Sequence, residues 1–188
     1  MKTKIKKTMF AGLTLAVALI GCKKDDDLVP LPDPIVNEQE LITTMKLTLI
    51  DSSDAANIKT ATFRDPDGDG GVSYDIFDTI RLEPAKTWYV SILLLNETAS
   101  PIDTISNEVL EEANDHLFCF SPGGTSATVL ITDLDGNSFP VGLQSKWKTT
   151  SSGLGTMQIE LKHQPGIKNG TCGVGETDID ILFPVKIQ

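Results

Sequence analysis

Two histidines are the only ones in the chain, and each stands beside residues that could help it bind a metal ion. His116 follows an acidic segment in which Glu112 lies four residues earlier, a spacing that places both side chains on one face of a helix. His163 ends an alternating segment just before Gln164-Pro165-Gly166. Two imidazoles and a carboxylate suit zinc or copper. If the fold brings these segment ends together, His116, His163 and Glu112 would form a transition-metal site.

Each histidine also has a simpler interpretation. His116 could cap the C-terminus of the helix as a cation, where the helix dipole favours positive charge. His163 could form hydrogen bonds within a loop and nothing more. The residue types alone leave both alternatives open.

A glycine-rich acidic segment at 65–71 is a candidate for calcium. Asp65, Asp67 and Asp69 alternate along it, and carboxylates spaced in this way can converge on one hard cation in a tight loop. The bidentate glutamate of an EF-hand is replaced here by Ile76, so an EF-hand is excluded. The alternative is a turn between two strands, because Asp and Gly tolerate turn conformations.

The chain has three cysteines, for which we expect two different roles. Cys22 ends the stretch Leu19-Ile20-Gly21-Cys22, which resembles the lipobox of bacterial lipoproteins. Cys119 and Cys172 remain as an even pair, which in an oxidising compartment favours a disulfide. Two separate buried thiols are the alternative, since a sequence does not reveal the distance between two cysteines.

The first 21 residues have the organisation of a lipoprotein signal peptide, with lysines at the start and an apolar run at 9–20. That run is shorter than the roughly 20 residues needed to span a bilayer. We therefore expect a signal peptide at 1–21, a lipidated Cys22 with a disordered acidic and Pro-rich tether at 22–40, and one domain at 41–188. The acidic run after Cys22 resembles the surface-export signal of Bacteroidetes lipoproteins, which predicts a lipid-anchored protein of the outer membrane, exposed at the cell surface.

Alternation of polar and apolar residues is the main structural signal of the remaining chain. It predicts strands at 44–50, 59–64, 79–82, 87–95, 117–120, 127–132, 145–149, 155–162 and 178–187. The apolar run at 87–95 is typical of a central strand covered on both faces. Only 106–116 reads as a helix. Many short strands with one helix predict an all-β protein, an immunoglobulin-like β-sandwich.

Four stretches resemble a family of small Bacteroidetes, flavobacterial-type outer-membrane lipoproteins: 62–71, 111–116, 161–165 and 175–180. The likeness covers nearly the whole mature domain. Members are often labelled type 1 periplasmic binding fold proteins, and some accompany TonB-dependent outer-membrane receptors. The resemblance therefore implies an uptake-associated lipoprotein with such a receptor as its partner. A type 1 periplasmic binding protein needs two lobes of alternating strands and helices, so the sandwich remains our prediction of the fold.

The net charge of the chain and the absence of catalytic sequence motifs limit the functions that we expect. The chain has a net charge of −10, and loss of residues 1–21 with their four lysines would make it −14. Such acidity argues against nucleic acid as a partner, because nucleic-acid binding needs a basic surface. The sequence contains no nucleophile elbow, zinc-protease motif or phosphate-binding loop, so we expect no enzyme. We expect a binding accessory that captures a metal ion or a metal-bearing ligand, and the alternative is a structural or adhesive surface module.

Overall fold

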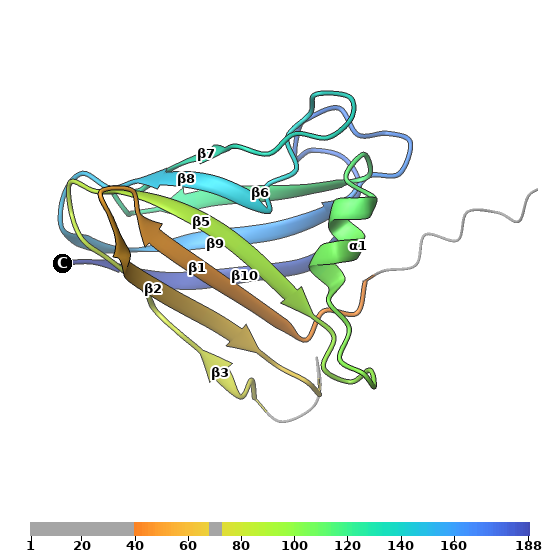
Figure 1. Ribbon diagram of the computed structural model, residues 1–188, viewed down its shortest axis with the longest axis horizontal. Helices are drawn as coiled ribbons and strands as arrows, with labels where there is room; N and C mark the ends of the chain where they lie inside the picture. The colour runs from red at the N-terminus through yellow and green to blue at the C-terminus, as the bar shows by residue number, and fades with distance from the viewer. Residues whose placement is uncertain (1–39, 68–72) are drawn as a thin grey trace, which may run out of the picture. The chain divides into compact units, whose positions relative to one another are not determined.

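Two packed β-sheets dominate the computed structural model, which describes residues 40–67 and 73–188. The first sheet has the order β3-β2-β1-β5-β8-β7, formed by β1 Thr44–Asp51, β2 Asp54–Arg64, β3 Ile76–Phe77, β5 Thr87–Leu95, β7 Thr128–Ile131 and β8 Gln144–Lys148. The second has the order β4-β10-β9-β6, formed by β4 Ile80–Leu82, β6 His116–Gly123, β9 Gly153–His163 and β10 Glu176–Ile187. Helix α1, Ile105–Glu111, lies near one end of the sandwich (Figure 1).

The core forms between the sheets because inward-facing apolar residues alternate with polar ones along each strand. Met45, Leu47 and Leu49 of β1 are fully buried, whereas Lys46 between them is exposed. Met157, Ile159 and Leu161 of β9 are likewise fully buried, on the inner face of the second sheet. Burying one such side chain contributes about 1.5–3 kcal/mol. The prediction of an all-β sandwich with one short helix is confirmed.

The structure corrects the expectation that the strand at 87–95 is covered on both faces. Trp88, Val90 and Leu94 of β5 are buried, but Tyr89 is 50 % exposed and Leu93 is 37 % exposed. Although β5 pairs with β1 on one side and β8 on the other, its antiparallel sheet meets the second sheet on one face only.

The predicted helix at 106–116 also ends early. Helix α1 stops at Glu111, and the backbone N–H of Asp115 donates to the carbonyl of Glu112 in the turn that follows. Asn114 and Asp115 favour such a turn because their side chains compete for backbone hydrogen bonds. His116 therefore begins strand β6, so the expectation that Glu112 and His116 share one face of a helix is wrong.

Several predictions fall outside the described residues. These are the signal peptide at 1–21, the lipidation of Cys22, the tether as far as residue 39, and Asp69 of the calcium-like segment. No helix within residues 40–67 and 73–188 is both long enough and apolar enough to cross a membrane.

Candidate metal centre

The two histidines lie directly opposite each other on neighbouring strands. His116 of β6 pairs with His163 of β9 in the antiparallel register. On β9, His163 continues the inward-facing series of Ile159 and Leu161, so both rings point into the end of the sandwich. His116 is completely buried and His163 is 8 % exposed. Their rings stack with centroids 4.6 Å apart and planes 4° from parallel.

Hydrogen bonding defines which nitrogen of His116 is available. Its Nδ1 lies 3.2 Å from the backbone carbonyl oxygen of Glu112. A carbonyl can only accept, so Nδ1 carries the proton and donates, which leaves the lone pair on Nε2. Nε2 is buried and has no hydrogen-bond partner among the described residues. Burial lowers the pKa of His116, so the ring is neutral at pH 7, the state in which imidazole binds metals.

Glu112 completes a three-residue group at this place. It is the C-cap of α1 and is exposed, so its carboxylate connects the buried histidines with solvent. One ligand atom from each of Glu112, His116 and His163 can be chosen so that all three lie within 4.8 Å of one another. The structure thus brings together the three residues predicted from sequence, through a turn rather than through a helix face.

Asp178 lies beside this group, close to His116, and was missed by sequence reasoning. The β9–β10 register shifts between Thr177 and Ile179, so Asp178 is the extra residue of a β-bulge. Bulges redirect side chains and are common beside functional sites. The Asp178 side chain is 1 % exposed, and its Oδ2 lies 4.0 Å from Nε2 of His116.

The environment of Asp178 favours a cation. Its Oδ2 has no hydrogen-bond partner among the described residues, although it faces the lone pair of His116. Burial raises the pKa of Asp178 to about 6, because a charged carboxylate loses its hydration there. Two facing acceptors in a buried position are unfavourable unless a proton or a metal ion lies between them. The carboxylate and the imidazole are therefore complementary to a bound cation.

Further carboxyl groups lie beside this end of the sandwich. Burial raises the pKa of Glu108 on α1 to about 7, and the neighbouring carboxylates of Glu40 and Asp103 add to the shift. Burial also raises the pKa of Glu40, and the charges of Asp178 and Glu112 raise it further. The negative potential of these groups favours a cation over an anion.

The donor set fits zinc or copper, with a modest change in the rings. Lone pairs of imidazoles lie in the ring planes, so two parallel stacked rings cannot both aim at one ion. For a tetrahedral ion with ligands at about 2.0–2.1 Å, neighbouring ligand atoms lie about 3.3 Å apart, compared with 4.0 Å between His116 Nε2 and Asp178 Oδ2 here. Binding therefore requires rotation of at least one ring and a small approach of the carboxylate.

The structure agrees with neither of the alternative roles considered for the histidines. His116 does not cap the helix as a cation, because α1 ends at Glu111 and burial keeps the imidazole neutral. His163 does not lie within a loop; it is the last residue of β9. Gly175 packs against its backbone with a φ of +84°, and a Cβ added there would lie 2.3 Å from the carbonyl oxygen of His163. The backbone of His163 is thus tightly held where the strand ends.

The calcium-like segment lacks a comparable grouping. Asp65 and Asp67 follow directly after β2, and Asp69 lies outside the described residues. Within the part of the chain that the structure describes, no set of three acidic, cysteine or histidine ligands includes Asp65 or Asp67. Asp75, farther along, forms an ion pair with Arg64.

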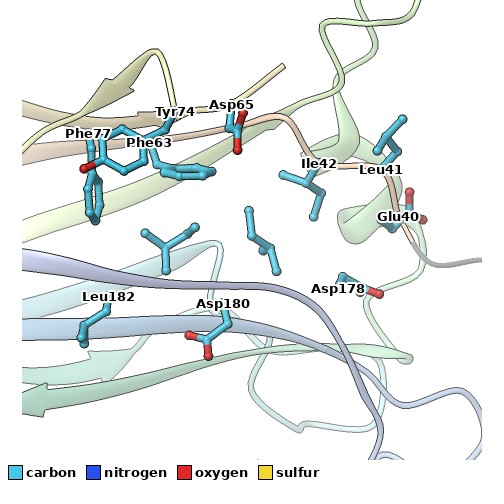
Figure 2. Close-up of a pocket in the computed structure, with 12 residues that line it drawn as sticks. Glu40, Leu41, Ile42, Phe63, Asp65, Tyr74, Phe77, Asp178, Asp180 and Leu182 are labelled. Carbon is cyan, nitrogen blue, oxygen red and sulfur yellow. The ribbon is translucent and has the colours of Figure 1, made fainter. Parts of the chain in front are cut away.

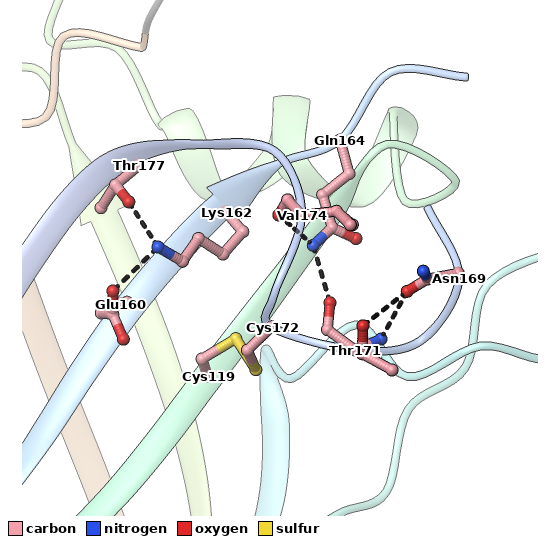
Figure 3. Close-up of a disulfide and its surroundings, with 9 residues drawn as sticks. All are labelled: Cys119, Glu160, Lys162, Gln164, Asn169, Thr171, Cys172, Val174 and Thr177. Atoms are coloured by element: carbon pink, nitrogen blue, oxygen red, sulfur yellow. Dashed lines mark hydrogen bonds and ion pairs between the residues drawn. A yellow bond between two sulfur atoms is a disulfide. The ribbon is translucent and has the colours of Figure 1, made fainter. Parts of the chain in front are cut away.

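Cys119 and Cys172 form a disulfide that ties a loop to β6 (Figure 3). Their Cα atoms lie 6.0 Å apart. The loop is also held by Gln164, whose side-chain amide donates to the carbonyls of Thr171 and Val174, each at 2.9 Å. This loop connects His163 with the bulge that carries Asp178, so the disulfide helps to position both.

Comparison of the chain with protein-family models, with curated proteins and with solved structures found no match in any of the three.

Proposed function

We propose that this protein binds a zinc or copper ion through His116, His163 and Glu112. The observation that carries the proposal is the convergence of three metal-ligating side chains, with ligand atoms within 4.8 Å of one another, at one end of the sandwich. The exposed Glu112 gives an ion access from solvent, and the buried, neutral imidazole of His116 supplies a lone pair on Nε2.

In the cell, the protein would act as an accessory to uptake, and metal binding would be its task. The lipobox-like sequence ending at Cys22 and the acidic run after it support a lipid-anchored protein at the surface of the outer membrane. The resemblance to lipoproteins that accompany TonB-dependent receptors supports such a receptor as the partner. A metal ion, or a ligand carrying one, would be captured close to the site of uptake.

One observation favours a second candidate, a structural or adhesive surface module. The rings of His116 and His163 stack almost in parallel, an arrangement that two buried rings can adopt as ordinary packing. In that case the pair would fill the end of the core, and the acidic groups around it would serve solubility. Metal affinity separates the two candidates.

The test is calorimetric titration of the purified protein with Zn²⁺ and with Cu²⁺ at pH 7. We expect the His116→Ala/His163→Ala double variant to bind at least 100-fold more weakly, because two of the three ligands are lost. Since both histidines are buried, the exposed ligand is tested separately: Glu112→Gln should fold normally and bind at least tenfold more weakly. Glu111→Gln, the exposed neighbour, is the matched control and should bind as the parent does.

No binding by the parent would leave the surface module as the function, and equal affinity of the parent and the Glu112→Gln variant would remove Glu112 from the proposed ligand set. Circular dichroism of each variant checks that the sheets are intact. A parallel titration with Ca²⁺ shows whether any affinity reflects the general acidity of the surface rather than the histidines.

A further inference from the structure

Strand β10 has an incompletely paired edge. On one side it pairs with β9 from Glu176 to Ile187, with Asp178 as the bulged residue. On the other side β4 pairs only with Val185, Lys186 and Ile187. Among the strands that the structure describes, none pairs with residues 178–182 on that side, which we call the open edge of β10. Unpaired strand edges are templates for the addition of another strand.

A cleft of about 770 Å³ lies along this open edge (Figure 2). All five consecutive residues of the open edge line it. Successive residues of a strand point to opposite faces, so a cleft over one face would be lined by every second residue. Lining by consecutive residues means that the cleft follows the backbone edge itself, where amide and carbonyl groups lie.

The opposite wall of the cleft is aromatic. Phe63 of β2, Phe77 of β3 and Tyr74 form a cluster in which the ring centroids of Tyr74 and Phe77 are 5.0 Å apart. Phe77 also contacts the core ring of Phe183, with centroids 5.7 Å apart. Tyr74 is 51 % exposed, so the wall is accessible from solvent. Such a wall can accept the apolar side chains of an added strand.

The charge of the cleft is entirely negative. Among its lining residues, Glu40, Asp65, Asp178 and Asp180 are acidic and none is basic. Asp178 and Glu40 lie together at one end, as Figure 2 shows. A segment that enters the cleft is therefore favoured if it carries lysine or arginine, and an acidic segment is repelled.

We propose that the open edge of β10 binds an extended segment of a partner protein by strand addition. The segment alternates apolar and basic side chains: its backbone pairs with residues 178–182, its apolar side chains contact the aromatic wall, and its basic side chains meet the carboxylates. Backbone hydrogen bonds supply affinity in this mode of recognition, and side-chain pockets supply specificity. This interaction surface goes beyond metal binding and does not require His116 or His163.

The test uses a synthetic probe, an eight-residue peptide of alternating lysine and valine with blocked ends, titrated into the purified protein at pH 7. We expect it to bind at least tenfold more tightly than the matched peptide of alternating glutamate and valine. Amide hydrogen exchange should slow at every second residue within 179–182 when the lysine peptide is bound, because only the N–H groups that point away from β9 gain new partners by strand addition.

Two surface variants provide a matched pair. Tyr74→Arg places a positive charge in the cleft and should weaken binding of the lysine peptide at least tenfold. Tyr89→Arg introduces the same change at an equally exposed tyrosine, 50 % exposed on the outer face of β5, and should leave binding unchanged. The His116→Ala/His163→Ala variant should retain peptide binding even where metal binding is lost.

Equal affinity for the lysine and glutamate peptides would overturn the proposal. It would also be overturned if exchange slowed elsewhere than at residues 179–182. Concentration-dependent dimerisation that protects the same amides without peptide would show that a second copy of this chain occupies the edge, which equally contradicts the proposal.

Discussion

Replacement of Lys168 by methionine is expected to lower the free energy of unfolding by roughly 3–5 kcal/mol. The Nζ atom of Lys168 lies 2.8 Å from a carboxylate oxygen of Asp135 and donates to the carbonyl of Ala113 at 2.7 Å. The two charged side chains are 2 % and 0 % exposed. Methionine keeps the apolar stem of lysine but removes its charge, which leaves Asp135 buried and unpaired by a cation.

Several hydrogen-bond donors stabilise the charged carboxylate of Asp135. Burial alone would raise its pKa, but hydrogen bonds from Lys168 and from the backbone N–H groups of Phe139 and Asn137 hold the pKa below its usual value. The carboxylate is therefore ionised at neutral pH and needs a positive partner.

Urea unfolding at pH 7 measures the loss in Lys168→Met. The double variant Lys168→Met/Asp135→Asn should recover at least half of it, because the amide keeps an oxygen acceptor for the two backbone N–H groups without a buried charge. A loss below about 1 kcal/mol in the single variant, within the range of exposed ion pairs, would contradict a buried and essential pair.

Removal of the disulfide is expected to cost roughly 4 kcal/mol. Cys119 and Cys172 are 53 residues apart in sequence, so the bond removes considerable freedom from the unfolded chain. The Cys119→Ser/Cys172→Ser variant should unfold at lower urea than the parent.

The reductant dependence provides the control. A strong reductant should destabilise the parent to the level of the double serine variant and leave that variant unchanged. If the parent were insensitive to reductant under unfolding conditions, Cys119 and Cys172 would be two separate thiols, the alternative that the sequence left open.

Local patterns accounted for much of the fold. The alternation at 44–50 predicted β1 closely, because a period of two is a property of the strand itself. The apolar run at 87–95 predicted the bounds of β5, although not its single buried face. The beginning of β2 at Asp54 was missed, since the sequence Asp54-Ala55-Ala56-Asn57 is polar or small and has no alternation. Its pairing with β1, which follows from the tight turn at Ser52 and Ser53, makes it a strand despite this.

The candidate site depends on contacts that no local pattern contains. Residue type singled out His116, His163 and Glu112, but their proximity follows from the β6–β9 register, a pairing between segments far apart in the chain. Asp178 could not be found from sequence because nothing in Thr177-Asp178-Ile179 predicts a bulge; only the β9–β10 register reveals it. The pairing of Lys168 with Asp135 joins two loops in the same way.

Anomalous diffraction at the zinc edge, from crystals of the zinc-loaded protein, tests the central claim most directly. We expect one peak with ligand atoms at about 2.0–2.2 Å from His116, His163 and Glu112, and rings no longer stacked in parallel. Asp178 would lie closer to Nε2 of His116 than the 4.0 Å found here. A zinc peak elsewhere, with the two rings still stacked, would contradict a metal centre at this end of the sandwich.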